Sequence, residues 1–443
     1  MVLRILACGI ACLAAACNAS AAEGSRPNIL FIFGDDLGID GIGCYGSDRA
    51  KSLTPNIDAL AKSGTKFERC YSTPLCGPSR CVIMTGRYGF RTGGLTNQTA
   101  GSPKSQDEPS LAKILKQAGY ATAMAGKWRQ MGETPGDWGF DEYVMSPTAG
   151  GWFWKDNYTK NGQEVKTDKE VYYPDVCADF AIDFMRRNKD RPFYFYLSEH
   201  LVHGPIVKTP ASNPDAAPDQ IYNDMIVHLD QRVGQMVKAL EELGLREKTM
   251  ILFTTDNGTA PPAYQPQHDP KMDIGKIGGR AVNGRKGQLL EGGSRVPLIA
   301  SWKGTLPPGK SSSDLIDFSD LLPTFADLAG AKLPANVKFD GKSFAPQLRG
   351  EAGQPREWIF VQLGAGWYVR DSGWKMNEKG ELFSMKDAPF AEELVPADSS
   401  AADAKAARQR LQAVLDELNP KGGKTVPADG GGTKKKNRKK AAA

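Results

Sequence analysis

Short apolar runs alternate along the chain with amphipathic segments. Four of the runs are apolar at nearly every position, as central strands are when helices cover both faces of a sheet. These runs are Asn28–Phe33, Ala121–Ala125, Phe193–Leu197 and Met250–Thr255. Amphipathic stretches that predict helices lie between them, at Asn56–Ser63, Ser110–Ala118 and Gln220–Leu243. The pattern predicts an α/β fold with an open sheet between helices, in which ligands bind beyond the carboxyl ends of the strands.

The pattern changes near residue 346. Three short segments predict antiparallel strands, the last as a hairpin that turns at Glu378–Gly380. These segments are Trp358–Gln362, Trp367–Arg370 and Trp374–Met385. A helix is predicted over Ala401–Leu418. We therefore predict a main α/β domain over 23–345 and a small antiparallel α+β subdomain over 346–420.

The first 22 residues predict a secretory signal peptide. Arg4 precedes an apolar stretch that runs to about Cys17, and Ala19-Ser20-Ala21 is a cleavage pattern of small residues. This stretch is the only long apolar run, and it is too short for a stable membrane span. We expect an exported protein, periplasmic or secreted, without a transmembrane segment. Lipid modification at Cys17 is the alternative.

Positive charge is concentrated in the last 23 residues. Residues 421–443 contain eight Lys or Arg and one acid, so the other 420 residues account for −2 of the net charge of +5. A nearly neutral body argues against nucleic acid as a partner. The tail has too few apolar residues to pack, which predicts disorder. It is either simply solvated or attracted to a polyanionic polysaccharide or an anionic envelope surface.

Two of the predicted strands end in paired oxygen ligands. NILFIFG leads into Asp35 and Asp36, and MILFTT leads into Asp256 and Asn257. If these strand ends are neighbours, the four side chains supply an all-oxygen cage, which suits a hard cation such as Ca²⁺ or Mg²⁺ better than zinc. The alternative is that both are ordinary turns, since Asp-Asn-Gly is a good turn sequence.

A cysteine lies at the predicted start of a helix. Pro78 suits a first helical turn, which places Cys76 just before the N-terminus, where free N–H groups favour an anion, and Arg80 one turn later. The alternative is a buried or disulfide-bonded cysteine. Without the signal peptide the cysteines are Cys44, Cys70, Cys76, Cys81 and Cys177. If Cys76 is chemically converted, the other four can form up to two disulfides in an oxidising compartment.

Six motifs occur in an order that resembles the type I sulfatases, a branch of the alkaline phosphatase superfamily. The central one is Cys-x-Pro-Ser-Arg followed by Thr-Gly-Arg, within Cys76–Arg87. The others are Pro27–Asp36, Thr54–Phe67, Gly126-Lys127-Trp128, Asp256–Gly258 and Gly287–Pro297. The resemblance covers most of the chain. It implies a large mixed, mostly parallel sheet sandwiched by helices, with a small C-terminal antiparallel subdomain.

The resemblance also implies a modified nucleophile. In such enzymes the motif cysteine, here Cys76, is oxidised to Cα-formylglycine by a separate maturation enzyme. One hydroxyl of the hydrated aldehyde attacks the sulfur of a sulfate ester, the alcohol leaves, and collapse of the diol expels sulfate. Calcium, rather than magnesium, is expected to activate the diol and polarise a sulfate oxygen. Its implied ligands are Asp35, Asp36, Asp256, Asn257 and the converted Cys76.

The same resemblance assigns roles to three cationic side chains. Arg80 is expected to hold the formylglycine and to offset acidic charge. Lys127 and Lys286 are expected to bind sulfate oxygens through charge-assisted contacts that strengthen in the transition state. Outside these motifs, either lysine would be interpreted as a solvated surface residue, and Arg285 is an alternative to its neighbour Lys286.

Proton transfer leaves alternatives open. His203, followed by Gly-Pro, is expected to protonate the leaving oxygen, and His200 is its competitor. The family usually has a histidine after Gly-Lys-Trp that assists loss of the second diol proton, but Arg129 occupies this position, and arginine is a poor base. Either His268 takes that proton, or Arg129 orients the diol or binds an anionic substrate while water serves, or catalysis is impaired. Arg129 and His268 therefore join the predicted substrate-binding residues.

The expected function is hydrolysis of a sulfate monoester, on a sulfated small molecule or polysaccharide. Gly150–Trp154 and Gly364–Tyr368 are aromatic, glycine-bearing segments that either contact sugar rings or pack in the core. Two rivals remain. One is a phosphoester hydrolase of the same superfamily, which shares the metal and the scaffold. The other is a silent sulfated-glycan-binding protein, which Arg129 motivates.

Overall fold

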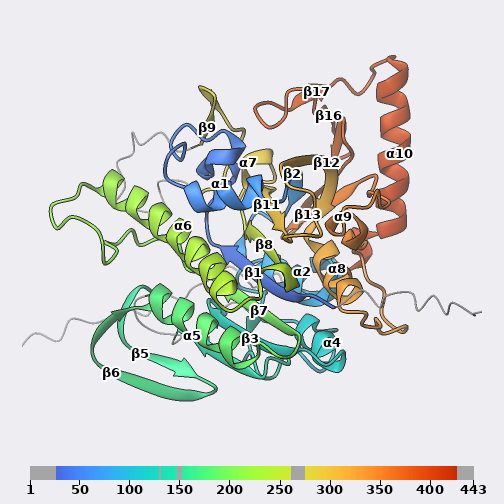
Figure 1. Ribbon diagram of the computed structural model, residues 1–443. Coiled ribbons are helices and arrows are strands. Elements are labelled where there is room, and N and C mark those ends of the chain that lie inside the picture. Colours follow the sequence, from blue (N-terminus) through green and yellow to red (C-terminus); the bar gives the residue numbers. More distant parts are fainter. Residues whose placement is uncertain (1–25, 129–130, 147–151, 261–274, 427–443) are drawn as a thin grey trace, which may run out of the picture.

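The computed structural model describes residues 26–128, 131–146, 152–260 and 275–426. Its centre is a ten-stranded sheet in the order β12-β2-β11-β8-β1-β7-β3-β4-β5-β6 (Figure 1). The five strands β8-β1-β7-β3-β4 are mutually parallel, and antiparallel pairs flank them. The strands are β1 (Asn28–Gly34), β2 (Thr65–Tyr71), β3 (Ala121–Gly126), β4 (Glu142–Met145), β5 (Trp154–Lys160), β6 (Gln163–Tyr172), β7 (Phe193–Ser198), β8 (Thr249–Thr255), β11 (Arg295–Ser301) and β12 (Lys310–Asp317). The predicted large, mixed and mostly parallel sheet is confirmed.

Helices cover both faces of this sheet (Figure 1). On β1, Ile29, Phe31 and Phe33 belong to one apolar cluster, which α2, α4 and α8 complete, whereas Leu30 and Ile32 belong to a second cluster with α1, α5 and α6. Because successive side chains of a strand point to opposite faces, burial on both faces makes the whole run apolar. These helices are α1 (Pro55–Lys62), α2 (Cys76–Thr85), α4 (Leu111–Gln117), α5 (Tyr173–Arg187), α6 (Pro218–Glu242) and α8 (Leu321–Leu328).

The four predicted central strands correspond to β1, β3, β7 and β8, and the three predicted helices correspond to α1, α4 and α6. The ribbon formed by β5 and β6 was not predicted. It projects from one edge of the sheet, at the lower left of Figure 1, and most of its residues are exposed and polar. Such strands lack the apolar run that marks a buried strand.

A second, five-stranded antiparallel sheet follows towards the C-terminus. Its strands are β13 (Ile359–Leu363), β14 (Gly366–Arg370), β15 (Trp374–Asn377), β16 (Leu382–Ser384) and β17 (Glu393–Val395). The predicted hairpin is β15–β16, the predicted helix is α10 (Ala402–Leu418), and β17 was not predicted. Apolar side chains of this sheet pack with Tyr71 and Leu315 of the large sheet. The domain boundary at 345/346 stays a prediction.

The predicted tail begins too early. Residues 421–426 belong to the described part of the chain, and the backbone N–H of Lys424 donates to Phe90 O at 2.6 Å. These residues therefore pack against the main domain, because backbone hydrogen bonds fix them there. Residues 427–443 and the predicted signal peptide over 1–22 lie outside the described residues. Within the described part, no helix is both long and apolar enough to cross a membrane.

The cysteines do not form the disulfides that their number allowed. Cys44, Cys70, Cys81 and Cys177 are all described, and none is in a disulfide. Cys70 and Cys81 are packed in the apolar cluster on one face of the sheet, and Cys177 in the cluster on the other face. They behave as small apolar residues, a common role for buried cysteine.

Candidate active site

Four adjacent parallel strands deliver polar side chains to one edge of the sheet. Asp35 and Asp36 follow β1, and Asp256 and Asn257 follow the neighbouring β8, with Gly34 opposite Thr255 in the register. Asp256 Oδ1 accepts from Asp36 N at 3.1 Å, and Asn257 Nδ2 donates to Asp36 Oδ1 at 2.9 Å. The two oxygen pairs predicted from distant parts of the sequence therefore meet.

Cys76 is the first residue of α2 and is 1% exposed. Its Sγ and one carboxylate oxygen each of Asp35 and Asp256 lie within 4.8 Å of one another. Asn97 was not predicted. Its Oδ1 accepts from Gly77 N at 2.9 Å and lies 3.6 Å from Cys76 Sγ, so Asn97 helps to fix the start of α2. No motif in the sequence marked this asparagine.

Arg80 lies one helical turn beyond Cys76 and faces the same point. Its Nη2 donates to Asp256 Oδ2 at 3.1 Å and lies 3.6 Å from Asp35 Oδ2. Its Nη1 donates to Tyr196 Oη at 3.1 Å and to Ser198 Oγ, both on β7. Arg80 is 1% exposed, so these contacts hold a permanent positive charge beside the carboxylates.

Lys127 and Lys286 bring two more buried cations to the carboxylates. Lys127 follows β3, and its Nζ donates to Asp35 Oδ2, while Lys286 Nζ donates to Asp36 Oδ1 at 2.5 Å. Although burial lowers the pKa of each ammonium, Asp35 raises the pKa of Lys127 and Asp36 raises that of Lys286 above the ordinary value. Both lysines are therefore charged and are not the solvated surface residues of the alternative interpretation.

Gly126 makes the position of Lys127 possible. Its φ is +110°, and a Cβ there would lie 1.9 Å from the backbone oxygen of Ser198. Only glycine tolerates both the conformation and the close approach of β3 to β7. Lys127 N then donates to Ser198 O at 2.7 Å, which fixes the backbone from which the lysine side chain extends.

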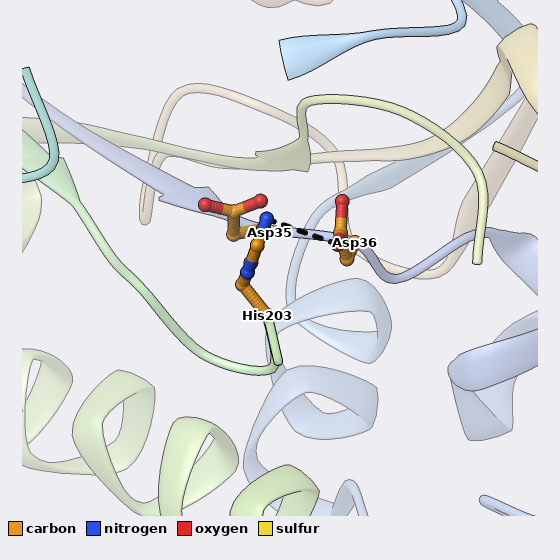
Figure 2. Close-up of side chains that lie close together, drawn as sticks. All are labelled: Asp35, Asp36 and His203. Carbon is orange, nitrogen blue, oxygen red and sulfur yellow. Dashed lines mark ion pairs between the residues drawn. The ribbon is translucent and has the colours of Figure 1, made fainter. Parts of the chain in front are cut away.

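His203 reaches the same carboxylates from the loop after β7. Figure 2 shows its imidazole directed at the two aspartates, with Nε2 3.5 Å from Asp36 Oδ2. Its Nδ1 lies 2.6 Å from Gly204 O, and the ring centroid of Trp152 lies 4.3 Å from that of His203. The competitor His200 is 2% exposed, and its Nε2 lies 3.4 Å from Ser146 Oγ. Of the two histidines, His203 is thus the one that contacts Asp36.

The carboxylates of Asp35 and Asp256 differ in their electrostatic surroundings. Burial would raise the pKa of Asp35, but Lys127, His203 and Arg80 hold it well below its usual range. Burial and the charge of Asp35 raise the pKa of Asp256 to about 7. Three acidic side chains and three cations are thus packed together in buried positions, and the balance of charge depends on what else binds.

The oxygen atoms that remain at this site fit a hard cation. Asp35 Oδ1 and Asn257 Oδ1 are buried and have no hydrogen-bond partner among the described residues. Buried oxygens without a partner are costly, and a bound cation would satisfy them. One carboxylate oxygen of Asp35, one of Asp36 and a nitrogen of His203 also lie within 4.8 Å of one another. Carboxylate and amide oxygens are the ligands that Ca²⁺ and Mg²⁺ prefer.

Nine of the eleven predicted site residues therefore meet at one edge of the sheet: Asp35, Asp36, Cys76, Arg80, Lys127, His203, Asp256, Asn257 and Lys286. Arg129 and His268 lie outside the described residues, so the predictions for them are not tested here. Trp152 was noted as part of an aromatic segment, but its contact with His203 could not be predicted, because it depends on the packing of distant segments.

Comparison with known proteins identifies the family to which the sequence is similar. A family model described as "Sulfatase" matches residues 27–331. The chain is 33% identical to human arylsulfatase A over 370 residues, which covers 75% of this chain and 70% of that protein. It is 32% identical to the N-acetylgalactosamine-6-sulfatase of Canis lupus familiaris over 376 residues, which covers 76% of this chain and 69% of that protein.

Solved structures agree with the sequence comparison. The crystal structure of Ps i-CgsB in complex with k-i-k-neocarrahexaose has a TM-score of 0.72 and 29% identity, covering 89% of this chain and 92% of that chain. The PsFucS1 sulfatase from Pseudoalteromonas sp. has a TM-score of 0.70 and 25% identity, covering 92% of this chain and 93% of that chain.

Proposed function

Because the chain belongs to the sulfatase family and is a sulfuric ester hydrolase, we propose that it cleaves a sulfate monoester of a carbohydrate through a converted Cys76 beside Ca²⁺. The observation that carries this proposal is the convergence of three elements at one buried point. They are the cysteine at the N-terminus of α2, the two oxygen pairs at the ends of β1 and β8, and the cations that surround them.

Two lysines are placed to bind the sulfate group. Lys127 donates to Asp35, and Lys286 donates to Asp36. An ester sulfate carries negative charge on its oxygens, and ammonium groups in a water-excluded site bind such oxygens strongly. Arg80, held by Asp256 and by β7, offsets the carboxylates and keeps the site from repelling the anion.

His203 is placed to donate the proton that the leaving alcohol needs. Nδ1 donates to the Gly204 carbonyl, so Nε2 is the atom left to carry and transfer the proton. Asp36 lies 3.5 Å from Nε2 and stabilises the protonated ring, whereas burial and Lys127 lower the pKa of His203. A proton that is held by an acid with a lowered pKa is readily transferred.

Two groups that this chain acquires complete the proposed chemistry. Asp35, Asp36, Asp256 and Asn257 would hold Ca²⁺, which lowers the pKa of a bound hydroxyl and polarises a sulfate oxygen. Cys76, converted to formylglycine by a maturation enzyme, would supply a nucleophilic hydroxyl once hydrated. The signal peptide predicted over 1–22 would direct the protein to the periplasm or the medium.

A carbohydrate is the substrate class that the relatives favour. The similar structure of Ps i-CgsB was solved with k-i-k-neocarrahexaose, and a relative that is 32% identical is named an N-acetylgalactosamine-6-sulfatase. Arylsulfatase A, at 33% identity, makes an aryl sulfate the alternative substrate, with a phenol as its leaving group.

The proposal is tested by matched sulfate and phosphate esters of the same sugars and phenols, assayed with the matured, calcium-loaded protein. We expect release of sulfate from at least one sulfated sugar, and loss of this activity in Lys127→Met. Turnover of the phosphate esters alone would contradict the proposal and would favour the phosphoester hydrolase. Binding of sulfated sugar without release of either anion would favour the silent glycan-binding protein.

A further inference from the structure

Trp152 lies against the two side chains that hold opposite ends of the ester in the proposed function. Its ring centroid is 4.3 Å from that of His203, with the ring planes at 53°, and 5.1 Å from Lys127 Nζ. Lys127 binds a sulfate oxygen, and His203 protonates the oxygen that links sulfur to carbon. One indole thus contacts both residues and lies beside the position that the alcohol of the ester would take.

We propose that Trp152 forms the wall of the leaving-group subsite and selects a ring alcohol, a pyranose or a phenol, over a flexible alkyl alcohol. The inference rests on the proposed function and adds to it the residue that recognises the alcohol. Every sulfate ester presents the same anion to Lys127 and Lys286, so selectivity between esters comes from groups that touch the alcohol. A rigid, half-buried indole offers a flat apolar surface to a ring.

The packing behind Trp152 makes this wall rigid. His200 lies behind it, with ring centroids 5.8 Å apart, and His200 is itself in edge contact with Phe153 and Tyr173. His200, Phe153 and Tyr173 are all buried. These buried neighbours restrict the movement of the indole, because close-packed side chains resist displacement. This assigns a role to His200, the competitor of His203, as support for the wall.

Trp154 provides a matched control two residues further along the chain. It is 37% exposed, its ring packs on Tyr172 at 5.1 Å between centroids, and its Nε1 donates to Lys208 O at 2.8 Å. These contacts belong to the projecting β5–β6 ribbon and to the segment beside it. Trp154→Ala thus removes an indole of the same segment without touching the residues that bind the ester.

The test compares Trp152→Ala, Trp152→Phe and Trp154→Ala in the matured protein. The substrates are p-nitrophenyl sulfate, a sulfated monosaccharide and propyl sulfate, and inorganic sulfate is the inhibitor. We expect Trp152→Ala to lower kcat/KM for the two ring esters about ten- to a hundredfold, mainly through KM. The kcat/KM for propyl sulfate and the inhibition constant of inorganic sulfate should each change by no more than about threefold. Trp152→Phe should recover most of the loss, and Trp154→Ala should resemble the wild type.

Inorganic sulfate separates recognition of the alcohol from support of the anion site. If inhibition by sulfate weakens as much as kcat/KM falls, Trp152 only supports Lys127, and the inference is wrong. The inference is also wrong if Trp152→Ala leaves kcat/KM for the ring esters unchanged. If the wild type releases no sulfate from any ester, the proposed function fails instead. Calorimetry with the sulfated monosaccharide then tests the inference. Binding by Trp152→Ala about tenfold weaker than that by the wild type supports it, and equal binding overturns it.

Discussion

Two clusters of buried charge in this protein differ in how completely their polar atoms are satisfied. Where the small sheet meets the large one, the Glu291 carboxylate accepts from Tyr71, Arg370 and Arg295, so both of its oxygens have partners. At the candidate active site, Asp35 Oδ1 and Asn257 Oδ1 are equally buried and have no partner among the described residues. The first cluster is complete without a ligand, and the second is not.

This difference distinguishes charged residues that stabilise the fold from charged residues that can bind ligands and react. A saturated ion cluster joins two parts of a fold, and removal of one member leaves a buried charge without compensation. A cluster with unused ligand atoms beside a nucleophile can instead bind a cation and an anion. Substitutions at the first should therefore cost stability, and substitutions at the second should cost activity, which the following predictions test in order of expected effect.

Loss of the nucleophile should have the largest effect. Cys76→Ala should reduce sulfate release roughly a thousandfold or more, because no remaining group replaces the proposed nucleophile. Its melting temperature should remain near that of the wild type, since alanine is a good helix residue. The measurement is sulfate release by ion chromatography, with thermal unfolding of the same sample.

Cys81→Ala is the matched control for Cys76→Ala, because Cys81 is a second buried cysteine of α2. It should keep its activity. If Cys81→Ala loses as much sulfate release as Cys76→Ala, damage to the helix rather than loss of a nucleophile explains the result.

The saturated cluster should show the opposite behaviour. Arg370→Ala should destabilise the protein by about 3–5 kcal/mol, because it leaves the buried Glu291 carboxylate short of a partner. Although burial raises the pKa of Glu291, Arg370 and Arg295 hold it below the ordinary 4.5. The stabilisation is therefore present above pH 4.5 and is lost as pH falls through the lower pKa of Glu291 in the folded state. The difference in melting temperature between the wild type and Arg370→Ala should therefore become smaller in acid.

The control for Arg370→Ala is Arg280→Ala, which breaks an exposed pair with Asp387. Its melting temperature should not change measurably, since exposed pairs contribute little. The double variant Glu291→Gln/Arg370→Met should be more stable than Arg370→Ala. If it is not, compensation of charge is not the reason for the loss.

Calcium should stabilise the site that has unused oxygens. At about one hundred times its dissociation constant, Ca²⁺ should stabilise the folded protein by about 2.7 kcal/mol relative to chelator. Mg²⁺ should have a smaller effect at the same concentration. The Arg370→Ala variant should keep this shift, because its defect is elsewhere. Equal shifts with both ions, or none, would count against a calcium site.

The smallest effect on stability is expected for Asp256→Asn in the metal-free protein. Burial and Asp35 raise the pKa of Asp256, so its ionised form is unfavourable in the folded protein. The amide keeps an oxygen for Arg80 but places its NH2 group at Asp36 N, to which Asp256 Oδ1 is bonded in the wild type. The metal-free variant at neutral pH should therefore lose no more than about 1 kcal/mol of stability, while its stabilisation by calcium is lost. Stability well below that of the wild type would show that this carboxylate is structural.

Much of this arrangement could be predicted from the sequence because local patterns determine it. The apolar run before Asp35 fixes β1, and the run before Asp256 fixes β8, and neighbouring parallel strands bring their carboxyl ends together. Contacts between distant segments could not be predicted. Asn97 and Trp152 reach the site through loops without a motif, and the polar strand β6 carries no apolar signal.

The central claim is that Cys76 is present as an aldehyde in the working protein. Mass spectrometry of the peptide that contains Cys76, from protein that releases sulfate, tests it most directly. The account predicts a mass roughly 18 Da below that of the unmodified cysteine peptide, the difference between a thiol and an aldehyde side chain. An active preparation in which this peptide retains the full mass of the thiol would contradict the account.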